Sequence, residues 1–384
     1  MTYSIETDLE KYFLSKRPEM IRMLRDFVNK DTHTYNQTGV NQLGTIISNQ
    51  MRKLGFTLQV IRQKEFGNQI IAKNSSQSKN RILILTHMDT VLPYEEGGYS
   101  FRIRNRNMAL GPGVADMKAS LVQMYYVLRA FQDMKIHCGP ITLFFNSDEE
   151  VGSPTSRRWI ETEAKKSRWC IVLESARPNG ALVVERKGTG IFEMKVEGKT
   201  AHSGADPQKG ASAIEELARK TISLHKLTNY KKGITVNVGI IQGGVARNVI
   251  AGSASAKIDV RIKFQKQINW VMNQMVEIAQ KQFIKGTKTE LIGSLTRPPM
   301  VPTKETGRLI DLIKEEAHRI KLDVSFVATG GASDGNFVSA LGIPTIDGMG
   351  PIGGSLCTPD EYSLLDSVPE RSALLALVML RLWS

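Results

Sequence analysis

Three short runs of apolar residues, each bounded by polar segments, constrain the fold of this chain most. Their sequences are RILILTHMD at 81–89, ITLFFN at 141–146 and WCIVLE at 169–174. Such runs are typical of strands that are buried on both faces, as strands of parallel sheets are. Helical patterns separate them, one of which runs from Asp116 to Phe131, with Asp116 placed to cap it. Strands that alternate with helices predict an α/β domain built on a mixed, mostly parallel sheet.

The pattern changes after about residue 187. Polar and apolar residues then alternate in IFEMKVEG, ITVNVGIIQGG and ASAKIDVRIKF, which predicts antiparallel strands with one exposed face. Helical patterns at about 211–227 and 268–285 accompany these strands. We therefore expect an inserted α+β domain at 188–296 within an α/β domain made of 1–187 and 297–384. Further helices are expected at 304–319 and 369–382.

Composition and charge narrow the class of protein. The chain has 41% hydrophobic and 23% charged residues, close to the globular average. Its longest apolar stretch, 373–384, is interrupted by Arg381 and is shorter than the roughly 20 residues of a membrane helix. The first ten residues include Glu6, Asp8 and Glu10 and do not resemble a secretory signal. We therefore expect a cytoplasmic protein that does not span a membrane.

Cysteine spacing and charge exclude further classes. The three cysteines form no CxxC pair, which argues against a disulfide framework or a structural zinc finger. The net charge of +13 favours anionic partners. The basic residues are scattered and are not interleaved with aromatic residues, unlike those of strand-binding surfaces. We therefore expect small acidic substrates and no binding of nucleic acid.

Side chains that bind metals follow all three predicted strands. Ligands of open α/β sheets bind at the carboxyl ends of the strands. One acidic residue after a strand is common in turns, but an imidazole together with several carboxylates suits zinc, with manganese or cobalt as alternatives. A carboxylate shared by two ions would make a two-metal site. The residues are His87 and Asp89, Asp116 after the turn 111–113, Glu149 and Glu150, and Glu174. In extended backbone Glu149 and Glu150 point in opposite directions, so that one can bind metal while the other carries a proton.

Six motifs together resemble those of the dizinc aminoacylase and carboxypeptidase family. This family includes acetylornithine deacetylases, succinyl-diaminopimelate desuccinylases and folate-cleaving glutamate carboxypeptidases, and the third and last motifs are most similar to the glutamate carboxypeptidases. The resemblance implies a zinc-peptidase-like catalytic domain and a ferredoxin-like inserted domain that acts as a lid and forms a homodimer. The motifs are THMDTV (86–91), GPGVADMK (111–118), NSDEEVGS (146–153), AHSG (201–204), RNVIAG (247–252) and GGASDGN (330–336).

The resemblance also implies roles for single residues. His87, Asp116 and Glu174 would hold the first zinc, and Asp116 would bridge to a second zinc held by Glu150. Glu149 would be the general base that deprotonates the metal-bridging water and later protonates the leaving nitrogen.

Other residues of the motifs would assist them. Asp89 would orient His87, and His202 would reach the partner's active site to stabilise the oxyanion. Asn248 and Arg261 would hold the substrate, with the backbone of Gly330 and Gly331 near its carboxylate end. The alternatives are a loop-starting role for His202 and an ordinary strand charge for Arg261.

Cys357 departs from the pattern of the family. Related sequences carry a histidine here that completes the shell of the second zinc, and the last histidine of this chain is His318. Cys357 could bind the second zinc as a thiolate, whose negative charge would weaken the Lewis acid and shift activity to alkaline pH. The second position could instead be weak or empty. The chain could also be a non-catalytic descendant that binds acidic peptides or acyl amino acids.

The sequence thus predicts a zinc-dependent hydrolase that cleaves an amide bond next to a free carboxylate, most like a glutamate carboxypeptidase. Two zinc ions per chain are expected, the second at Cys357. The alternatives are an N-acyl amino acid deacylase and a metal-impaired binding protein. The expected partners are a small acidic peptide or an N-acyl amino acid, and a second copy of the chain.

Overall fold

The computed structural model describes residues 4–75, 80–95 and 98–384. The chain divides into two compact units. The first unit comprises Met1–Glu185, Pro302–Ala328 and Ser333–Ser384, and the second comprises Arg186–Val301 and Thr329–Ala332. The sequence placed the changes of domain at 187/188 and 296/297 and did not single out 329–332. Among the described residues, every helix is too short or too polar to cross a lipid bilayer.

The first unit is built around a six-stranded sheet of order β1-β2-β6-β3-β7-β14. Strands β6, β3, β7 and β14 run parallel, and β1 and β2 are antiparallel additions at one edge. The predicted mixed, mostly parallel sheet is therefore confirmed. The strands are β1 (Thr57–Ile61), β2 (Gln69–Lys73), β3 (Ile82–His87), β6 (Ile141–Asn146), β7 (Trp169–Val172) and β14 (Thr345–Ile346).

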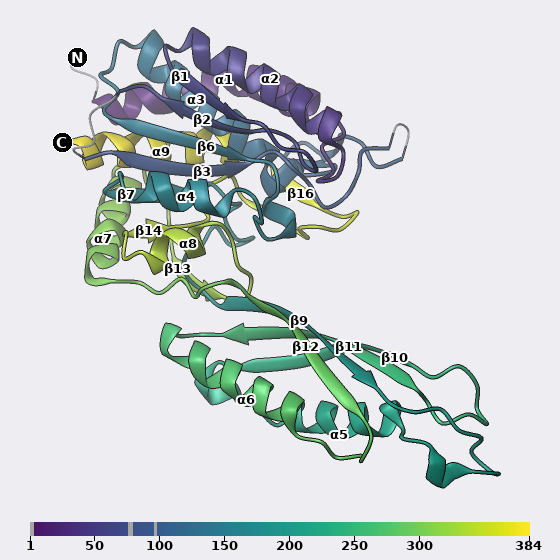
Figure 1. Cartoon of the computed structure of the whole chain (residues 1–384). Helices are drawn as coiled ribbons and strands as arrows, with labels where there is room; N and C mark the ends of the chain where they lie inside the picture. Colours follow the sequence, from purple (N-terminus) through teal and green to yellow (C-terminus); the bar gives the residue numbers. More distant parts are fainter. Residues whose placement is uncertain (1–3, 76–79, 96–97) are drawn as a thin grey trace. The chain divides into compact units, whose positions relative to one another are not determined.

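Helices cover both faces of this sheet (Figure 1). Because side chains alternate along a strand, Ile82 and Ile84 of β3 join the core on one face while Leu83 and Leu85 join the core on the other. This double burial explains the uninterrupted apolar run of the strand. The first face is covered by α1 (Ile5–Val28), α2 (Gln37–Lys53), α3 (Ala119–Asp133), α7 (Lys304–Arg319) and α9 (Ser367–Trp383), and the second by α4 (Arg157–Ala164) and α8 (Gly335–Ala340).

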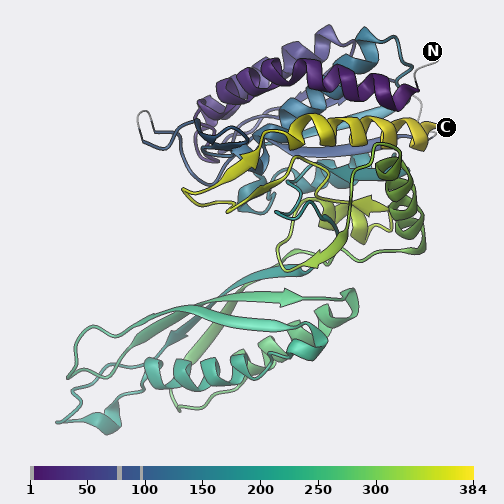
Figure 2. The same cartoon turned by 180° about the vertical axis from the view of Figure 1, so that it is seen from behind.

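The first and last helices of the chain lie side by side. Figure 2 shows α9, in yellow, next to α1, in deep purple. Leu374, Leu375, Leu377 and Val378 of α9 are all buried, so this helix is apolar almost all round. The contact ties the beginning of the chain to its end.

Smaller sheets surround the carboxyl ends of the central strands. One sheet has the order β15-β16-β5-β4, and its β15–β16 hairpin contains Cys357 in the connection between the two strands. Strand β5 leads into the turn that carries Asp116. The strands are β4 (Arg102–Asn105), β5 (Met108–Leu110), β15 (Gly353–Gly354) and β16 (Tyr362–Leu364), and a separate pair is formed by β8 (Leu182–Arg186) and β13 (Phe326–Thr329).

The second unit has a ferredoxin-like order of strands and helices, as expected. Its antiparallel sheet has the order β10-β11-β9-β12, and helices α5 and α6 pack on one face of it. The first and last strands are neighbours, with Thr189 opposite Arg297 and Arg186 paired with Met300, so the chain enters and leaves the unit side by side. The elements are β9 (Gly188–Glu197), α5 (Ala213–His225), β10 (Thr235–Gly243), β11 (Ser253–Ile262), α6 (Ile268–Gln280) and β12 (Lys288–Arg297).

Candidate metal centre

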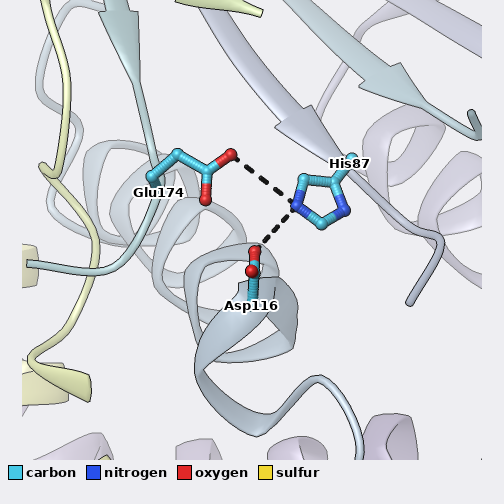
Figure 3. Close-up of side chains that lie close together, drawn as sticks. All are labelled: His87, Asp116 and Glu174. Carbon is cyan, nitrogen blue, oxygen red and sulfur yellow. Dashed lines mark hydrogen bonds and ion pairs between the residues drawn. The ribbon is translucent and has the colours of Figure 1, made fainter. Parts of the chain in front are cut away.

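Three of the predicted ligands converge beyond the carboxyl ends of β3 and β7. His87 is the last residue of β3, and Glu174 follows β7. His87 Nε2 lies 3.0 Å from Asp116 Oδ1 and 3.7 Å from Glu174 Oε1. Dashed lines mark these two interactions in Figure 3. All three residues are buried, and one ligand atom from each lies within 4.8 Å of the others. This spacing allows one ion to contact all three side chains.

Asp116 reaches this place because the helix after it begins later than the sequence predicted. Residues Val114–Lys118 form a wide π-type turn, in which Asp116 has φ −117° and ψ 85°, and α3 begins only at Ala119. The expectation of a helix that starts and is capped at Asp116 was therefore wrong. The backbone N–H groups of Ala115 and Asp116 donate to Oε1 of buried Glu361 over 2.8 and 3.0 Å. Glu361 thus fixes the backbone that presents the Asp116 carboxylate.

A second group of possible ligands shares Asp116. Ligand atoms of Asp116, Glu150 and Cys357 lie within 4.8 Å of one another. Cys357 Sγ lies 3.8 Å from Asp116 Oδ2, and Cys357 has a left-handed backbone with φ 59°. Asp116 therefore belongs to both groups, which is the arrangement that a carboxylate bridging two ions requires.

The concentrated negative charge changes the proton affinities of these groups. Burial and the charge of Asp116 raise the pKa values of Glu150 and Glu174 well above their ordinary range. Burial alone would lower the pKa of His87, but its hydrogen bond to Asp116 and the charges of Glu174 and Asp116 raise it well above 6.5. Burial and the charges of Glu150 and Asp116 raise the pKa of the Cys357 thiol. The metal-free cluster therefore favours the protonated forms of these groups, and a bound cation would compete with those protons.

Asp89 connects His87 to the turn that carries the paired glutamates. Glu149–Val151 is a 3₁₀ turn, so the alternation of side chains in extended backbone does not apply to Glu149 and Glu150. The backbone N–H groups of Glu149 and Glu150 donate to the Asp89 carboxylate over 3.3 and 3.2 Å. His87 Nδ1 lies 2.9 Å from the backbone oxygen of Asp89 and 3.6 Å from its carboxylate. The backbone of Asp89 therefore orients His87 more closely than its carboxylate does.

The other predicted site residues belong to the second unit. His202 Nδ1 accepts hydrogen bonds from the N–H groups of Gly204 and Ala205, each 3.1 Å long, which leaves the ring proton on Nε2 as a donor. His202 and Asn248 are exposed, and the N–H of Ser203 donates to the Asn248 carbonyl.

Arg261 and the glycine pair also have defined local partners. The Arg261 guanidinium forms a two-pronged ion pair with Asp259 at 2.9 and 3.0 Å. Gly330 and Gly331 are exposed, and Arg186 donates to the carbonyl oxygen of Gly331 over 3.2 Å. A carboxylate of the substrate would have to compete with Asp259 for the Arg261 guanidinium.

The two groups offer the donor atoms that zinc prefers. The first supplies an imidazole nitrogen and carboxylate oxygens, and the second supplies carboxylate oxygens and a sulfur. Nitrogen, sulfur and oxygen ligands of this kind suit zinc, and the sulfur disfavours the harder ions magnesium and calcium. The residues present therefore fit one or two zinc ions.

Comparisons with known proteins identify a family and several relatives. The sequence profile described as peptidase family M20/M25/M40 matches residues 83–381. Carboxypeptidase G2 from Pseudomonas sp. (strain RS-16) is 27% identical over 370 residues, which cover 93% of this chain and 87% of that protein. Succinyl-diaminopimelate desuccinylase from Thioalkalivibrio sulfidiphilus is 22% identical over 386 residues, or 95% of this chain and 99% of that protein.

The fold is also found among solved structures. The aminopeptidase PepT structure from Bacillus cereus superposes with a TM-score of 0.81 at 20% identity, covering 96% of this chain and 99% of that one. At this identity the likeness concerns the fold alone. It confirms the predicted class of an α/β domain accompanied by a smaller α+β domain.

Proposed function

The chain belongs to peptidase family M20/M25/M40 and is a metallohydrolase, and within that class we propose a two-zinc enzyme that cleaves an amide bond next to a free carboxylate. The observation that carries this proposal is the place of Asp116 in both ligand groups. The similarity to carboxypeptidase G2 along 93% of the chain favours a carboxypeptidase, most like one that releases glutamate.

In this proposal the two ligand groups hold the two ions. His87, Asp116 and Glu174 hold the first zinc, and Asp116, Glu150 and Cys357 hold the second. Bound zinc lowers the pKa of a water molecule to about 7 and polarises a carbonyl group. Glu361 keeps Asp116 in place through the two backbone hydrogen bonds.

Glu149 handles the proton in the proposed reaction. Its carboxylate takes a proton from the attacking water and returns it to the leaving nitrogen. The Glu149 charge contributes to the raised pKa values of His87, Glu150 and Glu174, which places it within electrostatic reach of the centre. Asp89 restrains the backbone of Glu149 through the hydrogen bond from its N–H.

The second unit supplies the remaining proposed roles. His202 donates from Nε2 to the developing oxyanion of the substrate in the partner's active site. Asn248 and Arg261 hold the substrate. Arg261 releases Asp259 and forms its two-pronged contact with the terminal carboxylate of the substrate instead. The backbone at Gly330 and Gly331 lies near the carboxylate end of the substrate.

We further propose that the second unit is a lid and forms a homodimer in the cytoplasm. Ile191, Ile240 and Ile292 are exposed around a 510 Å³ hollow on its sheet, an apolar surface that suits a protein partner. The three free cysteines are compatible with a reducing compartment. A monomer in solution, measured by light scattering, would remove the role given to His202.

The deacylase alternative rests on the similarity to a desuccinylase along 95% of the chain. A panel of peptides with C-terminal glutamate and of N-acetyl and N-succinyl amino acids separates the two functions by kcat/KM of the zinc-loaded protein. We expect the glutamyl peptides to be preferred by about tenfold or more, which is a difference of ~1.4 kcal/mol in transition-state binding. A preference for the acyl amino acids would identify a deacylase. Thermal stabilisation by the panel without any turnover would identify a binding protein.

A further inference from the structure

Three buried polar residues from two of the motifs have no role in the proposal so far. They are Asn146 and Ser153 of NSDEEVGS and Asp334 of GGASDGN. Asn146 and Ser153 are fully buried, and Asp334 is 4% exposed. All three belong to the first unit. Burial of a carboxylate is unfavourable unless hydrogen bonds compensate for it, so its partners indicate what it is held for.

Asp334 binds both of the other residues. Ser153 Oγ donates to Asp334 Oδ1 over 2.5 Å, and Asn146 Nδ2 donates to Asp334 Oδ2 over 2.6 Å. Asn146 Nδ2 also lies 3.0 Å from Ser153 Oγ, which closes the triangle. Asn146 and Asp334 are 188 positions apart in the sequence, so this is a tertiary contact and not a local turn.

Asn146 and Ser153 stand at the two ends of the turn that carries Glu149 and Glu150. Asn146 is the last residue of β6, where it lies opposite His87 of β3. Its Oδ1 accepts the N–H groups of Ser147 and Asp148, which starts the turn. Asp334 binds both Asn146 and Ser153 and therefore holds the two ends of the turn together.

The turn needs external support because of its backbone. Gly152 and Ser153 have φ values of 92° and 59°, and this left-handed region is unfavourable for a residue such as serine. On the side of β3, Asp89 accepts the N–H groups of Glu149 and Glu150. The paired glutamates are therefore held between two buried carboxylates, Asp89 and Asp334.

We propose that Asp334 is a positioning residue of the hydrolytic reaction, which fixes the orientation of Glu149 and Glu150 by binding both ends of the turn between Asn146 and Ser153. This inference rests on the proposed function, in which Glu149 is the base and Glu150 holds the second zinc. A proton-transfer group and a metal ligand on one turn must both be placed to within about 0.5 Å, so loosening the turn affects both.

The test uses the zinc-loaded full chain with Asp334→Asn, Ser153→Ala and the double variant. The amide that Asp334→Asn introduces keeps the shape of the side chain and one acceptor but removes the second acceptor. Ser153→Ala is the milder variant, because it removes only a hydroxyl and keeps the Cβ. The control is Glu163→Gln, which alters a buried carboxylate on α4 that pairs with Lys73 and Lys166.

We expect Asp334→Asn to lower kcat by about 10- to 100-fold with KM changed less than about threefold, and to weaken the second zinc by a similar factor while the first remains. Ser153→Ala should lower kcat and the affinity for the second zinc in the same direction. The double variant should lose no more of either than the more impaired single variant, because both substitutions break the same contact between Ser153 and Asp334. Glu163→Gln should lower the melting temperature without changing kcat.

Each other result overturns the inference. Unchanged kcat and zinc affinity in both folded single variants would leave Asp334 a purely structural residue. Additive losses in the double variant would mean that Ser153 and Asp334 act separately. If Asp334→Asn does not fold, an unaffected Ser153→Ala is sufficient to reject the link.

Failure of the proposed function would look different. A wild-type chain that binds two zinc ions but hydrolyses nothing in the panel contradicts the function, whereas loss of the second zinc in Asp334→Asn still supports the positioning of Glu150 by Asp334. A wild-type chain that neither hydrolyses the panel nor binds a second ion overturns both.

Discussion

Cys357 Sγ lies 3.8 Å from Oδ2 of Asp116, the carboxylate that belongs to both groups of candidate ligands. Burial and the charges of Glu150 and Asp116 raise the pKa of this thiol, so the metal-free cluster favours the protonated form. Zinc bound at Cys357 would reverse that preference, because the thiolate is the form that binds the ion. In the proposed two-zinc site, the identity of this side chain would govern the second metal position, which leads to the first two predictions.

Replacing Cys357 with serine is expected to weaken the second zinc by about tenfold or more without changing the first, because serine offers a much poorer ligand atom. Zinc titration of chelator-treated protein measures both affinities. In the cobalt-substituted protein, the near-ultraviolet band from sulfur-to-cobalt charge transfer should disappear in the variant. Cys138→Ser, at a partly buried thiol outside the two ligand groups, is the control. Two tightly bound ions in Cys357→Ser would exclude the thiol as a ligand.

Replacing Cys357 with histidine should shift activity to lower pH. The thiolate adds a negative charge to the centre, and a neutral imidazole removes it, so the pKa that governs the acid limb of the rate profile should fall by about one unit or more. The pH dependence of kcat for wild type and variant measures the shift. An acid limb that stays in place while the second zinc is retained would show that the sulfur charge does not act on the reacting water.

Replacing Glu149 with glutamine or alanine should abolish most of the hydrolysis while both ions stay bound. Loss of the proton carrier is expected to lower kcat by about 10²- to 10⁴-fold. Elemental analysis of the same preparation checks the zinc content. Glu161→Gln, at a partly exposed carboxylate of α4 that pairs with Arg157, is a matched control and should keep full activity. Turnover close to wild type in Glu149→Gln would assign the base to another residue.

Arg261→Lys should raise KM for substrates with a terminal carboxylate by about 10-fold, because lysine cannot form the two-pronged contact that arginine now makes with Asp259. A substrate amide in place of that carboxylate should remove the difference between wild type and variant. Lys257→Arg, on the same strand β11, is the control. Equal KM values for the acid in wild type and Arg261→Lys would leave Arg261 as a strand residue paired with Asp259.

The metal-free protein should lose stability as the pH rises from about 5 to about 7. Burial and the charge of Asp116 raise the pKa of Glu361 to about 7 from an ordinary 4.5. The folded state therefore binds a proton that the unfolded state releases, and the free energy of unfolding falls as the pH rises between these values. The raised pKa values of Glu150, Glu174 and His87 act in the same direction.

Lys118 has the opposite effect at higher pH. Burial lowers its pKa to about 7 from 10.5, so it adds stability as the pH rises between those two values. It therefore has little effect on the change in stability between about pH 5 and about pH 7. Melting temperatures in chelator and in excess zinc, measured across pH 5 to 7, check the prediction. The slope should be smaller with zinc and in Glu361→Gln. A melting temperature that rises with pH in chelator would contradict it.

The local sequence pattern was sufficient to predict strands and helices whose own apolar and polar residues show which of their faces are buried. The run ITLFFN gives β6 at Ile141–Asn146 and the amphipathic segment gives α7 at Lys304–Arg319, both as predicted. The start of α3 was missed because Asp116 is drawn out of helical geometry within a turn held by Glu361, which lies 245 positions away. A single sequence carries no local signal for such a contact.

The same reason separates the site residues that were found from those that were missed. His87 and Glu174 stand at strand ends, where topology alone brings side chains together. Asp334 and Glu361 act through hydrogen bonds to distant backbone or side chains, and neither was given a role from sequence. The Arg261–Asp259 pair was open to prediction, because residues two apart on a strand share a face.

The neighbouring ends of the second unit have a consequence for how such a chain can arise and be rebuilt. Arg186 and Met300 are paired where the chain enters and leaves, with Thr189 opposite Arg297 one step further in. A segment whose ends meet in this way can be added, exchanged or deleted as a cassette, because a short turn is enough to rejoin the flanking chain. The helices and strands of the first unit are encoded on both sides of that junction and need not change when the cassette does.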